Sequence, residues 1–278
     1  MHINSYFCMQ HVMERHLLTM KKAIGISTAN GYPFLSFRER FALFSKMGFQ
    51  SIMLWWGEGE RETRAQRVAL AKQYHLHIEN VHADMENSNS LWVSGACGDE
   101  KAEELVQAIV ECKIHGIKCM VVHLTNSNEP PEISDIGLLR MEKIFSTAKN
   151  HEVTLAIENV RTEKHIRYVL DHYHDKHIGF CLDTGHSNIW CKDVDWLSLY
   201  GDRLAAVHLH DNNGIKDGHS VPFTGTLDWN EIICQLSESS YHGSLTLETE
   251  YHGDENHEYL AKFLKDSYDA GLRLLEMR

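Results

Sequence analysis

The sequence predicts a single (β/α)8 TIM barrel, and three observations support that fold class. The chain has 278 residues, a length at which one barrel domain of about 250 residues is common. From Lys21 onward, apolar strand-like runs alternate with helix-period segments, and eight such pairs follow one another at a spacing of roughly 25–35 residues. Several apolar runs end in a carboxylate or an imidazole, as expected at the carboxyl ends of barrel strands.

Glycines and capping residues mark the ends of the expected elements. Gly48 and Gly116 follow helix-period segments and precede strands, as residues that end helices do. Asp99, Ser134 and Asp193 are predicted to cap helix N-termini. We expect strands at 23–28, 51–56, 77–84, 119–125, 154–160, 178–183, 204–211 and 244–251, and helices at 37–47, 62–74, 99–115, 135–150, 162–172, 193–200, 229–239 and 255–277.

The same alternation permits a doubly wound open sheet, which is the alternative fold. No Gly-x-Gly-x-x-Gly and no P-loop follows any expected strand, so nothing local indicates nucleotide binding. The eight repeated units and the polar strand ends favour the closed barrel.

Composition indicates one globular domain in a reducing compartment. Hydrophobic residues make up 43% of the chain and charged residues 24%, and no linker-like segment divides it. No apolar run reaches the roughly 18–20 residues of a membrane span. The seven cysteines include no Cys-x-x-Cys pair, so no disulfide framework is expected and a cytoplasmic location is predicted. Residues 1–20 lack the apolar core of a secretion signal, and we treat them as an N-terminal extension, disordered or an artefact of start-codon choice, with the barrel domain over 21–278.

Four consecutive expected strands, the fifth to the eighth, end in side chains that bind metals. These residues are Glu158, Asp183, His208 and Glu248. A charged group at the end of a buried strand is costly to desolvate unless something pairs with it, and a shared divalent ion is the simplest partner. Mixed carboxylate and imidazole ligands suit Mn, Zn, Co, Fe or Mg. Glu158 and Glu248 would also serve as an acid–base pair if they faced each other across a substrate.

Further polar residues are expected at the same end of the barrel. Each of them alone is more often a satisfied core or rim group, but together they are additional metal-ligand candidates. They are His82 after the third strand, His123 after the fourth, His186 after the sixth, and Asp217 and His219 after the seventh.

The polar strand ends lie in short motifs: Ile157-Glu-Asn159, Leu182-Asp-Thr-Gly-His186, Val207-His-Leu-His-Asp211, Asp217-Gly-His219, Gly225-Thr-Leu-Asp-Trp229 and Leu247-Glu248. Their order and spacing resemble the xylose-isomerase-like barrel superfamily over nearly the whole chain from Met20. That group contains sugar isomerases and epimerases, dehydratases and the endonuclease IV (apurinic-site) family. The resemblance implies that the four strand-end residues are the shared metal ligands, that Glu158 and Glu248 exchange protons with substrate, and that His186 holds a substrate oxygen.

Two branches of this superfamily have characteristic residues that can be compared with this sequence. Epimerases of free ketohexoses usually have an arginine shortly after the seventh-strand histidine, where this chain has Gly214. The endonuclease IV branch binds three zinc ions, and the resemblance implies that His82 and His123, together with His186, Asp217 and His219, correspond to its additional ligands.

The loops at the mouth of the expected barrel favour a small substrate over a nucleic-acid duplex. The loops at 85–99, 126–134 and 251–257 contain no Lys or Arg, and the chain carries a net charge of −12, whereas duplex binding requires cationic loops. Arg161 or Lys216 could hold one small phosphate, and Trp55 could stack on a sugar ring. In a strand His210 would share a face with His208, one step nearer the mouth, and so is a substrate-facing candidate.

The sequence therefore predicts a metal-dependent isomerase or epimerase that acts on a small sugar, sugar phosphate or related carbonyl compound. The first alternative is an endonuclease IV-like zinc phosphodiesterase. The remaining alternatives are a dehydratase of the same superfamily and a non-catalytic sugar-binding barrel. The expected partner is a small carbohydrate. A nucleic acid is the less favoured partner, no membrane is expected, and a homo-oligomer is left open.

Overall fold

The computed structural model describes residues 23–29, 31–58, 60–253, 255 and 257–278. Eight parallel strands form one sheet in the order β7-β6-β5-β4-β3-β2-β1-β8. The bridge between Leu209 and Leu247 joins the two ends of the sheet, with Leu209 N donating to Thr246 O at 2.9 Å. The strands are β1 (Ile24–Ser27), β2 (Ser51–Trp55), β3 (His77–His82), β4 (Cys119–Val122), β5 (Thr154–Glu158), β6 (Ile178–Asp183), β7 (Leu204–His208) and β8 (Leu245–Leu247).

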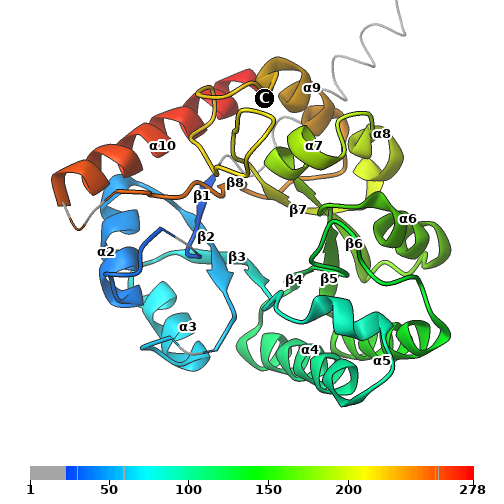
Figure 1. Ribbon diagram of the computed structural model, residues 1–278. Coiled ribbons are helices and arrows are strands. Elements are labelled where there is room, and N and C mark those ends of the chain that lie inside the picture. The colour runs from blue at the N-terminus through cyan, green and yellow to red at the C-terminus, as the bar shows by residue number, and fades with distance from the viewer. Residues whose placement is uncertain (1–22, 30, 59, 254, 256) are drawn as a thin grey trace, which may run out of the picture.

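Helices surround the strands on the outside of the barrel (Figure 1). The predicted (β/α)8 barrel is thereby confirmed, and the open-sheet alternative is wrong because the sheet closes. The helices are α2 (Phe37–Met47), α3 (Arg64–Gln73), η1 (Ser88–Trp92), α4 (Ala96–His115), α5 (Asp135–His151), α6 (Glu163–His172), α7 (Thr184–Trp190), α8 (Trp196–Tyr200), η2 (Gly201–Arg203), α9 (Trp229–Glu238) and α10 (His257–Met277).

Local sequence explains most of these boundaries. Ser36 caps α2 in a capping box with Glu39, and Gly48 ends the same helix in the left-handed region with a φ of 101°. Gly116 ends α4 in the same way with a φ of 73°. The predicted cap Ser134 accepts a hydrogen bond from Gly137 N at the start of α5.

Two predicted caps are wrong, and one helix was not predicted. Asp99 lies in the first turn of α4, which begins at Ala96, and its carboxylate pairs with Arg140 at 2.8 Å. Asp195, and not Asp193, caps the short helix α8. Helix α7 was not expected, because its seven residues are too few to show a helical period and Asp183, read as a strand end, also accepts a hydrogen bond from His186 N as its cap.

The core has two parts on either side of the strands. A large apolar layer packs between the strands and the helices. A smaller cluster of Cys119, Val121, Ala156, Cys181 and Ala206 is separate from it. Four of these five residues lie two positions before a site candidate, which puts both on the same face of the strand: Val121, Ala156, Cys181 and Ala206. Small side chains therefore fill the barrel below the site.

The two cysteines of this cluster are buried and free. Among the described residues, no helix is long and apolar enough to cross a membrane. The predicted N-terminal extension, residues 1–20, lies outside the described residues.

Candidate metal centre

The four strand-end candidates converge at the mouth of the barrel. Glu158, Asp183, His208 and Glu248 each offer a ligand atom, and these atoms all lie within 4.8 Å of one another. The Nδ1 atom of His208 lies 3.3 Å from a carboxylate oxygen of Glu158 and 3.3 Å from one of Glu248. His208, Glu158 and Asp183 are at most 1% exposed and Glu248 is 9% exposed, so the charges of this group are nearly free of solvent.

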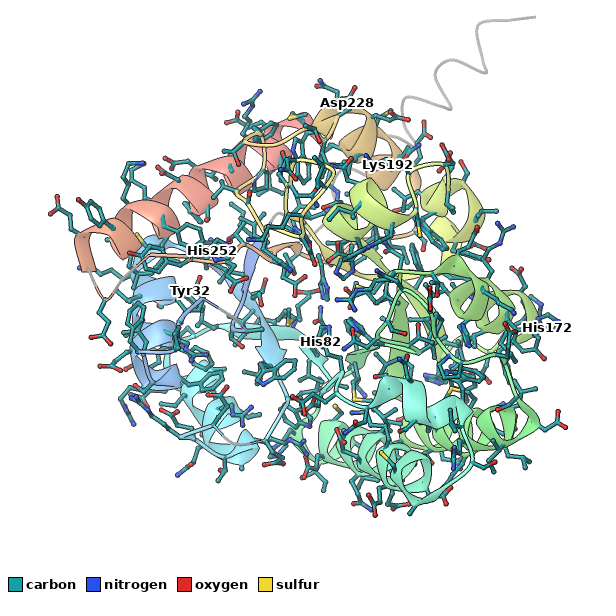
Figure 2. All side chains as sticks on the ribbon, in the orientation of Figure 1. Tyr32, His82, His172, Lys192, Asp228 and His252 are labelled. Atoms are coloured by element: carbon teal, nitrogen blue, oxygen red, sulfur yellow. The ribbon has the colours of Figure 1, made fainter. Side chains whose placement is uncertain are left out.

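Glu158 presents its two carboxylate oxygens to two different sets of residues. Oε1 lies 3.3 Å from His208 Nδ1 and 3.4 Å from His186 Nδ1. Oε2 lies 3.0 Å from both His82 Nε2 and His123 Nε2. The additional candidates on β3 and after β4 therefore meet the main group through one bridging carboxylate. Figure 2 shows His82 near the axis of the ring of strands.

Asp217 gathers the remaining candidates on the other side of the site. Its Oδ2 atom lies 3.3 Å from His186 Nε2 and 3.5 Å from His219 Nε2. Its Oδ1 atom is buried and has no hydrogen bond within the part of the chain that the structure describes. His219 also approaches Glu248, with Nδ1 4.0 Å from Oε2.

Backbone carbonyls determine the tautomers of three of these histidines. Nδ1 of His82 lies 2.7 Å from Ala83 O, Nδ1 of His186 lies 3.0 Å from Asn159 O, and Nδ1 of His219 lies 2.8 Å from Glu248 O. A carbonyl only accepts, so in each ring Nδ1 carries the proton and donates it. In the neutral ring Nε2 then holds a lone pair.

These three Nε2 atoms face carboxylate oxygens, which are also acceptors. Nε2 of His82 lies 3.0 Å from Glu158, and those of His186 and His219 lie 3.3 Å and 3.5 Å from Asp217. Two acceptors at such distances need a second ring proton or a metal cation between them. A histidine that donates one nitrogen to a backbone carbonyl and directs the other to an ion is the usual arrangement of metal ligands, so the donor set fits divalent metal.

Burial and opposite charges move the pKa values of this group. Burial alone would raise the pKa of Glu158, but His123 and His208 more than offset it and hold this pKa well below its usual range. Burial would also raise the pKa of Glu248, but His208 outweighs this effect and holds the pKa below its usual range. Burial would lower the pKa of His219, yet Asp217 and Glu248 raise it to about 10. Without metal, the two glutamates are therefore ionised and His219 is protonated at neutral pH.

His210 and Asn159 hold Asp183 in place. Nε2 of His210 lies 3.1 Å from both carboxylate oxygens of Asp183, and the His210 ring stacks on His219 with centroids 4.0 Å apart. Asn159 Oδ1 accepts from Asp183 N at 2.7 Å, and its Nδ2 donates to Asp183 O at 2.8 Å. His210 is fully buried, so the structure places it beside a ligand candidate and not at the substrate-facing surface that was predicted for it.

A cavity of about 160 Å³ opens directly above these residues. Trp55 and Arg161, both predicted to bind substrate, line it, whereas Lys216 is exposed on the β7–α9 loop and does not. The lining residues are Ala29, Trp55, His82, Met85, His123, Asn126, Glu158, Val160, Arg161, His186, Trp190, Asp217, His219 and Glu248.

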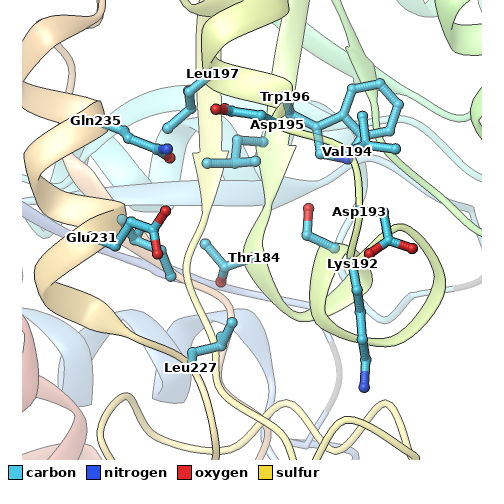
Figure 3. A pocket seen from close by; sticks show the side chains of 13 residues that line it. Thr184, Lys192, Asp193, Val194, Asp195, Trp196, Leu197, Leu227, Glu231 and Gln235 are labelled. Atoms are coloured by element: carbon cyan, nitrogen blue, oxygen red, sulfur yellow. The ribbon is translucent and has the colours of Figure 1, made fainter.

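Sequence reasoning missed three residues of this site, Trp190, Asn126 and Asn159. Trp190 lines the cavity and lies four residues after His186 on α7, where i,i+4 spacing puts both on one helix face, but that short helix was not expected. Asn159 follows Glu158 directly and was quoted only as part of a motif. A separate cavity of about 240 Å³ lies between α8 and α9, and none of the predicted site residues lines it (Figure 3).

The fold and the site together define a class of protein: a parallel (β/α)8 barrel with a candidate metal centre at the carboxyl ends of its strands.

Comparisons with known proteins identify the family. The family model described as xylose isomerase-like TIM barrel matches residues 41–272. The chain belongs to this family. Two curated relatives are uncharacterised proteins: y4fM of Sinorhizobium fredii, 41% identical over 78 residues, and MJ1311 of Methanocaldococcus jannaschii, 26% identical over 202 residues. The matched segments cover 28% and 65% of this chain, and 25% and 67% of those proteins.

Solved structures of the same fold include sugar epimerases. D-psicose 3-epimerase from Clostridium cellulolyticum, solved with D-tagatose, superposes with a TM-score of 0.74 at 13% identity, covering 91% of this chain and 99% of that one. The IolI protein with a bound zinc atom superposes with a TM-score of 0.72 at 14% identity, covering 91% and 98%. At these identities the likeness shows the shared fold.

Proposed function

We propose that the protein is a divalent-metal-dependent isomerase or epimerase that acts on a small sugar or related carbonyl compound. The observation that carries this proposal is the placement of Glu158 and Glu248, each 3.3 Å from the same nitrogen of His208. Two ionised carboxylates thus flank one buried point at the floor of the cavity. The epimerases of similar fold support a carbohydrate substrate.

The four strand-end residues would hold the ion, which when bound polarises a substrate carbonyl and acidifies the neighbouring C–H bond. One glutamate removes the proton from the carbon beside the carbonyl. The other glutamate, once it has taken a proton from solvent, delivers it either to the opposite face of that carbon or to the adjacent carbon. Because both pKa values lie below the usual range, both carboxylates are available as bases at neutral pH.

Substitution of Glu158 by Gln tests this role. We expect Glu158→Gln to lower the rate of proton exchange between substrate and solvent by at least about 100-fold, because the amide cannot act as a base. Incubation of a panel of aldoses, ketoses and their phosphates in deuterium oxide, read by mass spectrometry, measures that exchange. Glu250→Gln is the matched control, since Glu250 does not line the cavity. Wild-type exchange retained in Glu158→Gln would refute the proposal.

A second candidate function, phosphodiester hydrolysis at a multinuclear metal centre, is favoured by one specific observation. His82 and His123 join Glu158 at 3.0 Å, and Asp217 lies between His186 and His219, so all the residues that resemble the endonuclease IV ligands gather at one site. Incubation of zinc-loaded protein with an abasic-site duplex tests this candidate. Strand cleavage that His82→Asn abolishes would support it, and an intact duplex would exclude it.

A further inference from the structure

Arg161 occupies an unusual position at the rim of the cavity. It follows β5 three residues after Glu158, and its Nη1 donates to Asn126 O at 3.3 Å. The guanidinium carbon lies 5.3 Å from the centre of the Trp190 ring. Asn126 and Trp190 both line the cavity, so two sides of the guanidinium are held by residues of the same wall.

Trp190 connects this rim position to the metal centre. Its ring lies 5.2 Å from the ring of His186, which contacts both Glu158 and Asp217. A guanidinium over an indole face is held in orientation by cation–π attraction, while its N–H groups stay free to bind a ligand. The stack therefore directs the cation toward whatever occupies the cavity.

Arg161 has no carboxylate partner among the residues that the structure describes. Two other cations at the mouth do have carboxylate partners: Arg64 pairs with Glu58 and Glu111, and Lys164 pairs with Glu132. Arg161 is also the single Lys or Arg among the described residues that line the cavity. An unpaired guanidinium in a chain of net charge −12, beside a cavity with three carboxylates, indicates an anion supplied by the ligand.

We propose that Arg161, held by Trp190 and Asn126, binds an oxyanion of the substrate. The substrate is then a polyhydroxylated carbonyl compound that carries a phosphate or a carboxylate away from its reacting carbon. A guanidinium presents two parallel N–H donors that match either group. The carbonyl end of this substrate rests on the proposed function, whereas the anion site does not.

Binding of inorganic phosphate to metal-depleted protein tests the anion site without catalysis. Calorimetry should show one phosphate bound per wild-type chain, and Arg161→Gln should weaken its binding about 10- to 100-fold, as expected for hydrogen bonds to a charged group. Arg161→Lys should bind at intermediate strength because it keeps the charge and loses the paired donors. The circular dichroism spectra and melting temperatures of both variants, compared with wild type, show whether the fold is kept.

Lys164→Gln and Lys216→Gln are the matched controls, since neither lysine lines the cavity. We expect both to bind phosphate as wild type does. Absence of phosphate binding to wild type, equal affinity in Arg161→Gln, or loss of binding in Lys216→Gln would each overturn the proposal.

A comparison of substrates distinguishes the two sources of the oxyanion. If the substrate is a sugar phosphate, Arg161→Gln should raise KM for phosphorylated sugars about 10- to 100-fold and leave neutral sugars unchanged. If it is a sugar acid, the same rise should appear with uronates instead. An equal effect on neutral and anionic sugars would contradict the proposal. If wild type converts no sugar at all, the proposed function fails, while the phosphate titration still decides the anion site.

Discussion

Glu158 is the residue at which the two sides of the candidate metal centre meet. Its Oε1 faces His208 and His186, and its Oε2 faces His82 and His123. A buried carboxylate with four imidazoles around it is stable only if cations, either ring protons or metal ions, neutralise the lone pairs that face it. Glu158 therefore links the occupancy of one ion position to the protonation of the histidines around it.

The raised pKa of His208 makes metal binding compete with protons. Burial opposes, but Cys181, Glu248 and Glu158 outweigh it and raise the pKa of His208 well above its usual value. This ring is protonated in metal-free protein at neutral pH. An ion bound by His208 must displace the ring proton, so its affinity increases with pH.

Calorimetric titration of metal-depleted protein with Mn²⁺ between about pH 6 and about pH 8, where His208 is protonated without metal, measures this competition. We expect at least one proton released per ion, seen as a heat that depends on the ionisation enthalpy of the buffer. Affinity should rise about tenfold per pH unit for each displaced proton. A pH-independent affinity with equal heats in two buffers would show that His208 is neutral before the ion binds.

At the scale of elements, Asp211 organises the long connection between β7 and α9. This fully buried carboxylate accepts hydrogen bonds from Trp229 Nε1 at 2.9 Å and from the backbone N–H groups of Asn212, Phe223 and Leu227. The same connection carries Asp217 and His219. The loop that supplies part of the site is therefore tied to the end of the strand that supplies His208.

Removal of this carboxylate should destabilise the loop and the whole domain. We expect Asp211→Ala to lower the free energy of unfolding by about 3 kcal/mol, because several buried donors lose a charged acceptor. Urea denaturation measures the change, and limited proteolysis should show new cleavage within 212–228. Asp228→Ala, which removes only the exposed cap of α9, should cost about 1 kcal/mol. Equal costs for the two substitutions would contradict this role of Asp211.

The start of α7 requires a glycine because His210 lies directly against it. A Cβ atom on Gly185 would stand 2.0 Å from Cε1 of His210, whose ring is backed by His219 at a centroid distance of 4.0 Å. The His210 ring cannot move away from the added atom without displacing His219, and its movement would release Asp183.

Gly185→Ala should therefore weaken metal binding about 10- to 100-fold, as loss of a residue that orients a ligand does. Gly201→Ala is the control, because its added Cβ would meet nothing closer than 3.4 Å. Titration with Mn²⁺ followed by electron paramagnetic resonance gives both affinities. Unchanged affinity in Gly185→Ala would show that His210 does not position Asp183.

At the scale of the whole molecule, the barrel was predictable because its strands and helices repeat with a clear period. The ends of the strands identified Glu158, Asp183, His208 and Glu248 for the same reason: a charge that ends an apolar run stands out in a sequence. The contacts of His82 and His123 with Glu158 depend on the side-by-side pairing of β3, β4 and β5 in the sheet, and no spacing along the chain reveals them. Trp190 was missed because a seven-residue helix carries too few turns to show a period.

Anomalous diffraction from crystals soaked in Mn²⁺ or Zn²⁺, measured at the absorption edge of each metal, tests the central claim most directly. We predict a peak bound by Glu158, Asp183, His208 and Glu248, at the carboxyl ends of β5 to β8. Further peaks beside His82 and His123, or between Asp217 and His219, would favour the multinuclear phosphodiesterase over the isomerase. Absence of any peak among the four strand-end residues would contradict the metal centre on which both candidate functions rest.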